Sequence, residues 1–140
     1  MLGFTNGDHA ANALRRAGLS GEIFSWKDVL HQGPVPSQLS IDGLREVRAR
    51  FISERGWDGF DEVIKDFERR DAALAGCGDH EEVVLFFEHD LYDQLQLIQI
   101  LDWFARQEPS RTRLSLVQTG EYLGNLPPER LKLISKTVES

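Results

Sequence analysis

Residues 83–95 read VVLFFEHDLYDQL, and within this stretch one kind of pattern gives way to another. The first five residues are an unbroken apolar run, mostly β-branched and aromatic, which is typical of a strand buried on both faces of a parallel sheet. Glu88-His89-Asp90 interrupts the run, and residues 91–106 continue as an apolar segment rich in helix formers. The pattern predicts a buried strand that enters a helix through a short acidic loop. Ligands of open α/β sheets bind at such strand ends.

The N-terminal part shows the same succession of strand, turn and helix. Residues 1–5 are mostly apolar, residues 6–8 (Asn-Gly-Asp) have turn chemistry, and apolar residues then recur at helical spacing. Asp8 is expected to cap this helix at its N-terminus, and Gly18 to end it. Residues 22–29 alternate loosely and predict a second strand, which completes a right-handed β-α-β unit.

The remaining segments extend this unit into an α/β domain. A proline-rich loop over residues 30–36 precedes two amphipathic helices, predicted for residues 40–55 and 60–74, and residues 113–118 predict a fourth strand. We therefore expect one domain over residues 1–140 with a Rossmann-like, open, mostly parallel sheet. Its strands, at least four, would take the order 2-1-3-4 and be flanked by helices. Residues 29–80 would form a loop and two-helix insertion after the second strand.

The helix predicted after residue 90 has an unusual polar pair. A helical wheel leaves a wide apolar arc and one stripe with polar residues, so we expect the helix to be mostly buried, with the stripe outward. Asp93 and Gln94 fall inside the apolar arc, where packing alone favours leucine. Asp93 has an alternative explanation, because it can complete a capping arrangement with Asp90. The stripe consists of Tyr92, Gln96, Gln99, Trp103 and Arg106.

Composition narrows the class of protein. Hydrophobic residues make up 41% and charged residues 28% of the chain, as in ordinary globular domains. The net charge of −7 disfavours binding to nucleic acid and to acidic membrane surfaces. The single cysteine, Cys77, has no partner for an internal disulfide. We expect a cytoplasmic protein with neither nucleic-acid nor membrane partners.

The predicted topology gathers polar side chains at the carboxyl ends of the strands. Glu88, Asp90 and His31 are the candidate catalytic residues, because carboxylates and histidine transfer protons or bind metals. Asp8 and Asp90 have the alternative role of helix caps, and Trp26 that of a core residue. The candidate ligand-binding residues are Asn6, Gly7, Asp8, Trp26, Asp28 and Gln94.

This acidic set indicates some ligands and disfavours others. Five carboxylates at the strand ends disfavour a bare phosphate, namely those of Asp8, Asp28, Glu88, Asp90 and Asp93. Residues 6–8 match neither the dinucleotide fingerprint nor the P-loop. Oxygen ligands suit Mg²⁺ or Mn²⁺ as a cofactor. The first hypothesis is therefore a polar small molecule, such as a nucleotide or sugar, bound with or without a divalent metal, with hydrolase or transferase chemistry open. The second is a non-catalytic interaction or regulatory module whose acidic corner is a structural network. Homo-oligomerisation is compatible with both.

Two groups of motifs, Asn6-Gly7-Asp8 with Gly33-Pro34 and Glu88-His89-Asp90 with Gln94, resemble a bacterial family catalogued as domain of unknown function 1835. The first group lies in residues 6–35 and the second in residues 87–95, and the resemblance extends from about residue 1 to residue 133. It implies no particular activity, and the similar proteins usually continue into a further helical segment. The matching positions are Asn6, Gly7, Asp8, Trp26, Asp28, Gly33, Pro34, Glu88, Asp90 and Gln94.

Overall fold

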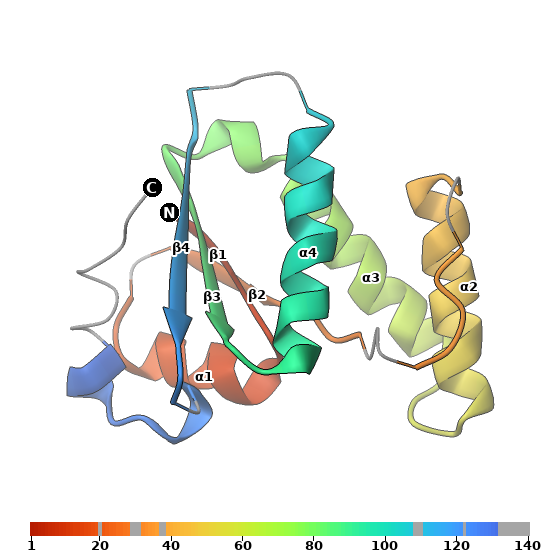
Figure 1. Cartoon of the computed structure of the whole chain (residues 1–140), viewed down its shortest axis with the longest axis horizontal. Helices are drawn as coiled ribbons and strands as arrows, with labels where there is room; N and C mark the ends of the chain where they lie inside the picture. The colour runs from red at the N-terminus through yellow and green to blue at the C-terminus, as the bar shows by residue number, and fades with distance from the viewer. Residues whose placement is uncertain (20, 29–31, 37–38, 108–110, 122, 132–140) are drawn as a thin grey trace. The chain divides into compact units, whose positions relative to one another are not determined.

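The computed structural model describes residues 1–19, 21–28, 32–36, 39–107, 111–121 and 123–131. Figure 1 shows the strands and the longer helices, and residues 128–131 are also helical. In this part of the chain, no helix combines the length and the apolarity needed to cross a bilayer. The elements are β1 (Leu2–Thr5), α1 (Asp8–Arg16), β2 (Glu22–Ser25), α2 (Ile41–Glu54), α3 (Phe60–Ala75), η1 (Cys77–Asp79), β3 (Glu82–Glu88), α4 (Leu91–Ala105), β4 (Arg113–Thr119) and η2 (Leu123–Asn125).

The four strands are parallel and lie in the order β2-β1-β3-β4, which confirms the predicted sheet. β3 has a neighbour on each side, and its residues 83–88 are all buried, which explains why residues 83–87 are apolar on both faces of the sheet. Phe4 of β1 lies in register between Phe24 of β2 and Leu85 of β3. Because all strands run the same way, their carboxyl ends meet at one edge of the sheet.

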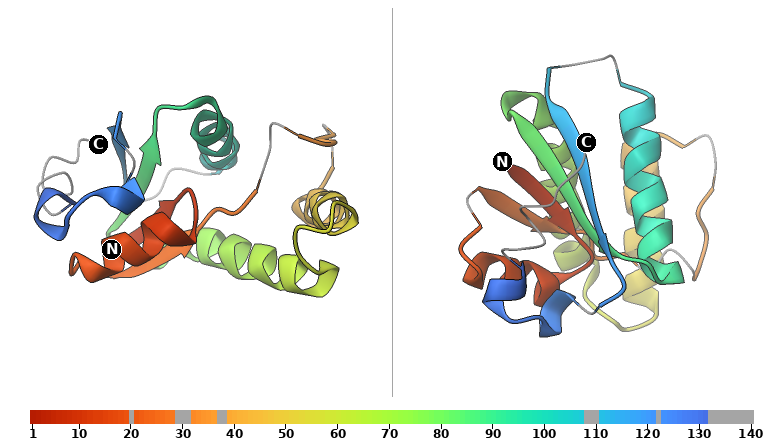
Figure 2. Two further views of the ribbon diagram at one scale, coloured as in Figure 1. Left: turned by 90° about the horizontal axis from the view of Figure 1, so that it is seen from below. Right: turned by 60° about the vertical axis from the view of Figure 1, so that its left-hand side comes forward.

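Helices α1 and α4 lie on opposite faces of this sheet, as the left view of Figure 2 shows. Small residues of α1 allow its backbone to approach the sheet closely. The helix ends at Arg16, Ala17 is its C-cap, and Gly18 follows with a φ of 80°, which favours glycine. This agrees with the predicted helix end. The buried cluster on the α1 face consists of Ala10, Ala11, Ala13, Leu14, Ala17, Ile23, Val84, Phe86, Val117, Leu123 and Leu131.

Asp28–Ala75, which covers most of the insertion expected at residues 29–80, forms a compact unit of its own. Met1–Lys27 and Gly76–Ser140 make up the unit with the sheet. In the insertion, the side chains of Arg48 and Asp28 are fully buried and form an ion pair of 2.7 Å. The Arg48 guanidinium also donates to the carbonyl oxygens of Gln32 (2.8 Å) and Pro34 (3.1 Å), which ties the proline-rich loop to α2. The core of this unit contains Ala49, Ile52, Val63 and Phe67.

Two local expectations are wrong. Asp8 is the first residue of α1 rather than its cap, because Gly7 occupies the N-cap position and no described side chain caps the helix. Helix α4 is not mostly buried, since Leu91 and Ile98 are exposed while Gln96 is buried. The wheel assumed that polar side chains face solvent. Gln96 instead donates to the main-chain oxygen of Trp26 at 2.8 Å.

Candidate functional site

An acidic cluster lies where β1 and β3 end. It consists of Glu88, the last residue of β3, together with Asp90 and Asp93 at the start of α4. Asp90 is the N-cap of α4, and its carboxylate accepts a hydrogen bond from the backbone N–H of Asp93 at 3.0 Å. The capping role expected for Asp90 is confirmed. One carboxylate oxygen from each residue lies within 4.8 Å of the others.

Asn6, directly after β1, joins the two buried carboxylates of the cluster. Its Nδ2 donates to Glu88 Oε2 at 2.7 Å and to the two Asp93 carboxylate oxygens at 3.1 and 2.9 Å. The backbone N–H of Glu88 donates to Asp93 Oδ2 at 2.6 Å, and that of Leu123 in η2 donates to Glu88 Oε1 at 2.7 Å. One amide and two backbone N–H groups therefore hold the two carboxylates together.

The charge of this cluster is only partly compensated. Glu88 and Asp93 are each 5% exposed, and among the described residues no basic side chain forms an ion pair with them or with Asp90. Burial raises the pKa of Asp93 to about 6, and the charges of Glu88 and Asp90 add to this rise. Hydrogen bonds from the Glu88 N–H and from Asn6 act in the opposite direction. A proton or a cation is therefore stabilised here near neutral pH.

The donor set fits a hard divalent cation. All three side chains offer carboxylate oxygens, the ligands that Mg²⁺, Mn²⁺ and Ca²⁺ prefer. Half a turn of the Asn6 amide would present its carbonyl oxygen in place of the NH₂ group, which adds a fourth oxygen. Asp90 is partly exposed and gives the cluster access to solvent. The structure brings together three of the predicted site residues, Asn6, Glu88 and Asp90.

Three other predicted site residues have different surroundings in the same unit. Gln94 is half-buried, and its Nε2 lies 3.4 Å from the main-chain oxygen of Glu88, which is a long hydrogen bond. Trp26 is a core residue whose Nε1 donates to Gln99 at 2.8 Å. Gly7 has an extended backbone, and a Cβ there would meet no atom within 4 Å.

Asp8 belongs to a separate polar group at the end of β2. Its carboxylate accepts hydrogen bonds from Ser25 at 2.7 Å and from Lys27 at 3.1 Å. The hydrogen bond from Ser25 and the positive charge of Lys27 hold the pKa of Asp8 below its usual value. Asp8 is therefore compensated by its neighbours, unlike the carboxylates of the acidic cluster.

The last two predicted residues are not part of this group. Asp28 lies in the helical unit, where its carboxylate pairs with Arg48. His31 lies outside the described residues. The sequence marked Asp93 as an unexpected polar residue with a capping alternative and did not name it as a site residue, whereas in the structure it is a central member of the cluster. The Leu123 N–H was missed entirely, because a backbone donor leaves no signal in the residue type.

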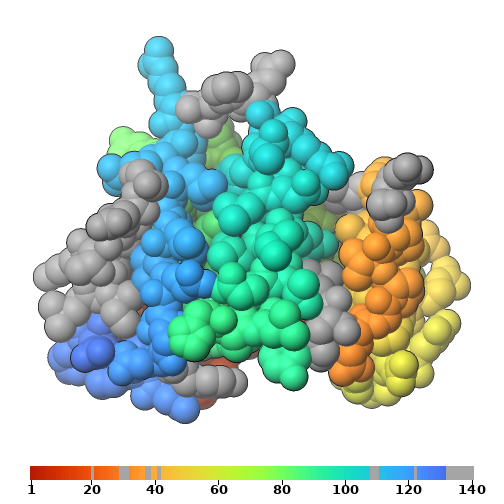
Figure 3. Space-filling view, in the orientation of Figure 1, coloured from red at the N-terminus to blue at the C-terminus, as the bar shows by residue number. Residues whose placement is uncertain are grey.

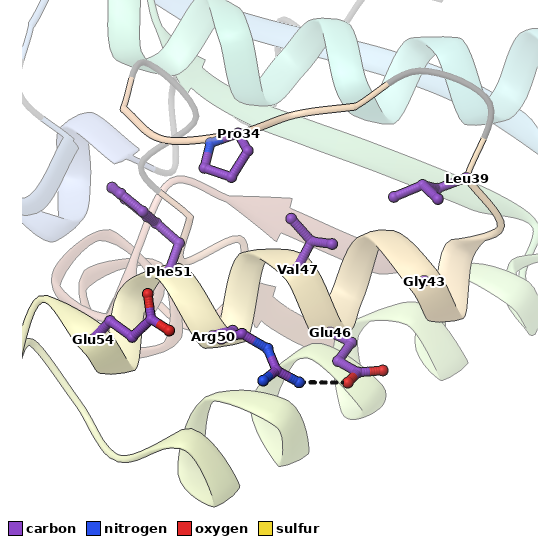
Figure 4. A pocket seen from close by; sticks show the side chains of 8 residues that line it. All are labelled: Pro34, Leu39, Gly43, Glu46, Val47, Arg50, Phe51 and Glu54. Carbon is purple, nitrogen blue, oxygen red and sulfur yellow. Dashed lines mark hydrogen bonds and ion pairs between the residues drawn. The ribbon is translucent and has the colours of Figure 1, made fainter.

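The helical unit contains a pocket of about 460 Å³ between the proline-rich loop and α2. Figure 4 shows the side chains of Val47 and Phe51 rising from α2 toward Pro34 and the loop, with Glu46 and Arg50 paired below them. The walls are mostly apolar and suit an apolar group. Sequence reasoning did not single out this pocket, because the spacing of residues along α2 is equally typical of a helix packed against its own core.

Comparison with known proteins found no matching family model, no matching curated protein and no matching solved structure. The resemblance to the family of domain of unknown function 1835 therefore stays a prediction.

Proposed function

We propose that this protein binds a polar small molecule, such as a nucleotide or a sugar, through a divalent cation held by the acidic cluster. The observation that carries the proposal is the close approach of three carboxylates, two of them buried, without an ion pair to any described basic residue. A buried charge of this kind is stable only when a proton, a cation or strong hydrogen bonds compensate it. A bound Mg²⁺ or Mn²⁺ would supply that compensation and a positive centre for a polar ligand.

The same residues suggest the chemistry that a bound cation would support. Asp90 is the accessible carboxylate, so it is the candidate to contact a ligand or to accept a proton from water. Glu88, Asp90 and Asp93 would together hold the cation, and Asn6 would orient the carboxylates of Glu88 and Asp93. We include hydrolysis or group transfer in this proposal as the reaction. The proposal also includes a cytoplasmic location and the resemblance to the family of domain of unknown function 1835.

A second candidate function has its own observation in favour. Both carboxylate oxygens of Glu88 accept short hydrogen bonds, one from Leu123 and one from Asn6. A network that satisfies its members without a ligand is what a non-catalytic interaction or regulatory module would contain. In that case the cluster only fixes η2 and the start of α4 against the ends of the strands.

Metal titration of the full chain tests the first function. The protein is freed of metal with EDTA, returned to chelator-free buffer, and titrated with MgCl₂ or MnCl₂ while its melting temperature and heat of binding are recorded. We expect the melting temperature to rise, because an ion at about 100 times its Kd stabilises the native state by about 2.7 kcal/mol.

The matched variants are Asp90→Asn and Asp8→Asn. Asparagine caps helices as well as aspartate does, so Asp90→Asn removes a charge and leaves α4 intact. We expect it to abolish most of the metal-induced rise, whereas Asp8→Asn, in the separate group at the end of β2, should leave it unchanged. No shift and no heat with Mg²⁺, Mn²⁺ or Ca²⁺ would reject metal binding and favour the structural network.

A further inference from the structure

The pocket of the helical unit has one wall in the proline-rich loop, and a buried side chain fixes that wall. Arg48 is fully buried and donates hydrogen bonds to the main-chain oxygens of Gln32 and Pro34. These bonds keep the loop beside α2, and Figure 3 shows the loop, in orange, at the surface in front of α2, in yellow. The loop wall is therefore in place before any ligand binds.

The helix wall is fixed through the ring of Phe51. The guanidinium carbons of Arg48 and Arg55 lie 5.2 and 5.1 Å from the centroid of this ring, and the Trp57 ring meets it edge-on at 5.9 Å. A Cβ on Gly33 would lie 2.6 Å from a carbon of the ring, so the loop approaches Phe51 as closely as a glycine allows. Turning Phe51 to fill the pocket would break these contacts.

The pocket has the size and the walls of a site for a small molecule. Its volume of about 460 Å³ lies within the range of about 300–1,000 Å³ that is usual for ligand pockets. Leu39 on its rim is 44% exposed, so the pocket can be reached from solvent, and Gly43 adds no side chain on the helix side. An aromatic or alkyl group would be stabilised here because the walls take it out of water. The apolar wall residues are Pro34, Leu39, Val47 and Phe51.

One end of the pocket carries an uncompensated negative charge. Glu46, Arg50 and Glu54 follow one another at intervals of one helical turn along α2. Arg50 pairs with Glu46 at 2.7 Å and lies over the ring of Phe60 at 6.0 Å. Among the described residues, the Glu54 carboxylate has neither an ion-pair nor a hydrogen-bond partner. Figure 4 shows this carboxylate beside Phe51. It would attract a cation at this end of the pocket and repel an anion.

We propose that this pocket binds a small organic cation with an apolar body, such as a primary amine that carries an aromatic or alkyl group. The body fills the space between the loop and α2, and the ammonium group lies at the Glu54 end. The net charge of −7 also attracts cations to the chain and repels carboxylates of the same size. The site is distinct from the acidic cluster, because its residues all belong to the helical unit.

Three probes with similar bodies and different head groups test the charge selection. They are 4-phenylbutylamine, 4-phenylbutanol and 4-phenylbutyrate, and their binding to the full chain is followed by calorimetry at pH 7 and low salt. We expect the amine to bind about two- to fivefold more tightly than the alcohol, because an ion pair with an exposed carboxylate is weak. The carboxylate should bind least tightly. Added NaCl should reduce the difference between the amine and the alcohol.

Substitutions place the probes in the pocket. Glu54→Gln should lower the affinity for the amine to that for the alcohol, whereas Glu68→Gln, at an exposed position of α3 outside the pocket, should change neither. Val47→Phe puts a larger side chain into the space and should weaken all three probes about tenfold or more. Leu39→Ala removes part of the wall at an exposed residue, so it should weaken the probes even if Val47→Phe does not fold.

The same measurements can overturn the proposal. It is rejected if no probe binds at millimolar concentration, if the carboxylate binds as tightly as the amine, or if Leu39→Ala leaves the binding unchanged. Equal effects of Glu54→Gln and Glu68→Gln would reject the ion pair at the pocket in favour of a general attraction to an acidic chain. Loss of amine binding in Asp90→Asn would place the amine at the acidic cluster and reject this site, whereas binding that survives Asp90→Asn supports it.

Discussion

The ionisation of Asp93 is coupled to the fold. Its pKa is raised to about 6 in the native protein, from 3.8 for an unperturbed side chain, because of burial and of the charges of Glu88 and Asp90. The native state therefore holds a proton on Asp93 more tightly than the unfolded state does. As a result, this residue makes the free energy of unfolding decrease between about pH 4 and pH 6, and contributes no further change above that range.

Urea denaturation in EDTA, at several pH values, checks this contribution. The loss attributable to Asp93 should be on the order of 2 kcal/mol between pH 4 and pH 6. Carboxylates with lowered pKa values, such as Asp8 and Glu82, act in the opposite direction, so the informative quantity is the difference between the parent and Asp93→Asn. If that difference does not change with pH, Asp93 is not the coupled group.

Substitution of two glutamines on α4 distinguishes a binding role from a structural role. Gln94 has one long hydrogen bond and is half-buried, whereas Gln96 is buried and donates at 2.8 Å. We expect Gln94→Leu to change the free energy of unfolding by less than about 0.5 kcal/mol and to weaken magnesium binding. We expect Gln96→Leu to cost about 1–3 kcal/mol, because it removes a buried hydrogen bond to the main-chain oxygen of Trp26. Equal losses for the two variants, together with a loss in Glu88→Gln, would favour the structural network.

At the scale of elements, the loop of the helical unit depends on one side chain of α2. Arg48 donates to Asp28 and to the carbonyl oxygens of Gln32 and Pro34. Lysine keeps the charge but lacks the planar set of donors, so Arg48→Lys cannot make all of these bonds. We expect a cost of about 3–5 kcal/mol, seen in denaturation, together with faster proteolysis around residues 32–36.

The matched control lies two residues further along the same helix. Arg50 pairs with Glu46 at 2.7 Å, but both side chains are mostly exposed. Arg50→Lys should therefore change the free energy of unfolding by less than about 0.5 kcal/mol. Similar effects at the two positions would show that the buried contacts of Arg48 do not hold the loop.

The strands and helices also show which parts of the fold could be predicted from sequence patterns. The strands were predictable because each is a short apolar run bounded by turn residues, and the parallel order follows from the alternation with helices. The orientation of α4 could not be predicted from the sequence, because Gln96 and Gln99 both bond to Trp26, which is 70 residues or more away in the chain. The same holds for the site: strand ends predicted Asn6 and Glu88 together, but the Leu123 N–H comes from a segment without a polar side chain to mark it.

At the scale of the whole molecule, the chain leaves the sheet after β2 and returns to it at β3. Between these points it builds the helical unit, with its own buried cluster. The two units therefore differ in the kind of contact that holds them. The helical unit depends on residues close in sequence, and the sheet on residues that are far apart.

That difference bears on the order of folding. Thr5 and Phe86, paired between β1 and β3, are 81 residues apart, so their meeting closes a long loop at a cost in chain entropy. A helical unit that forms first shortens this loop, because residues 28–75 are then a compact unit instead of an open chain. Phe67→Ala, which opens the core of that unit, should then slow the protection of β1 and β3 amides in pulse-labelled hydrogen exchange. An unchanged rate would mean that the sheet closes its long loop before the helices assemble.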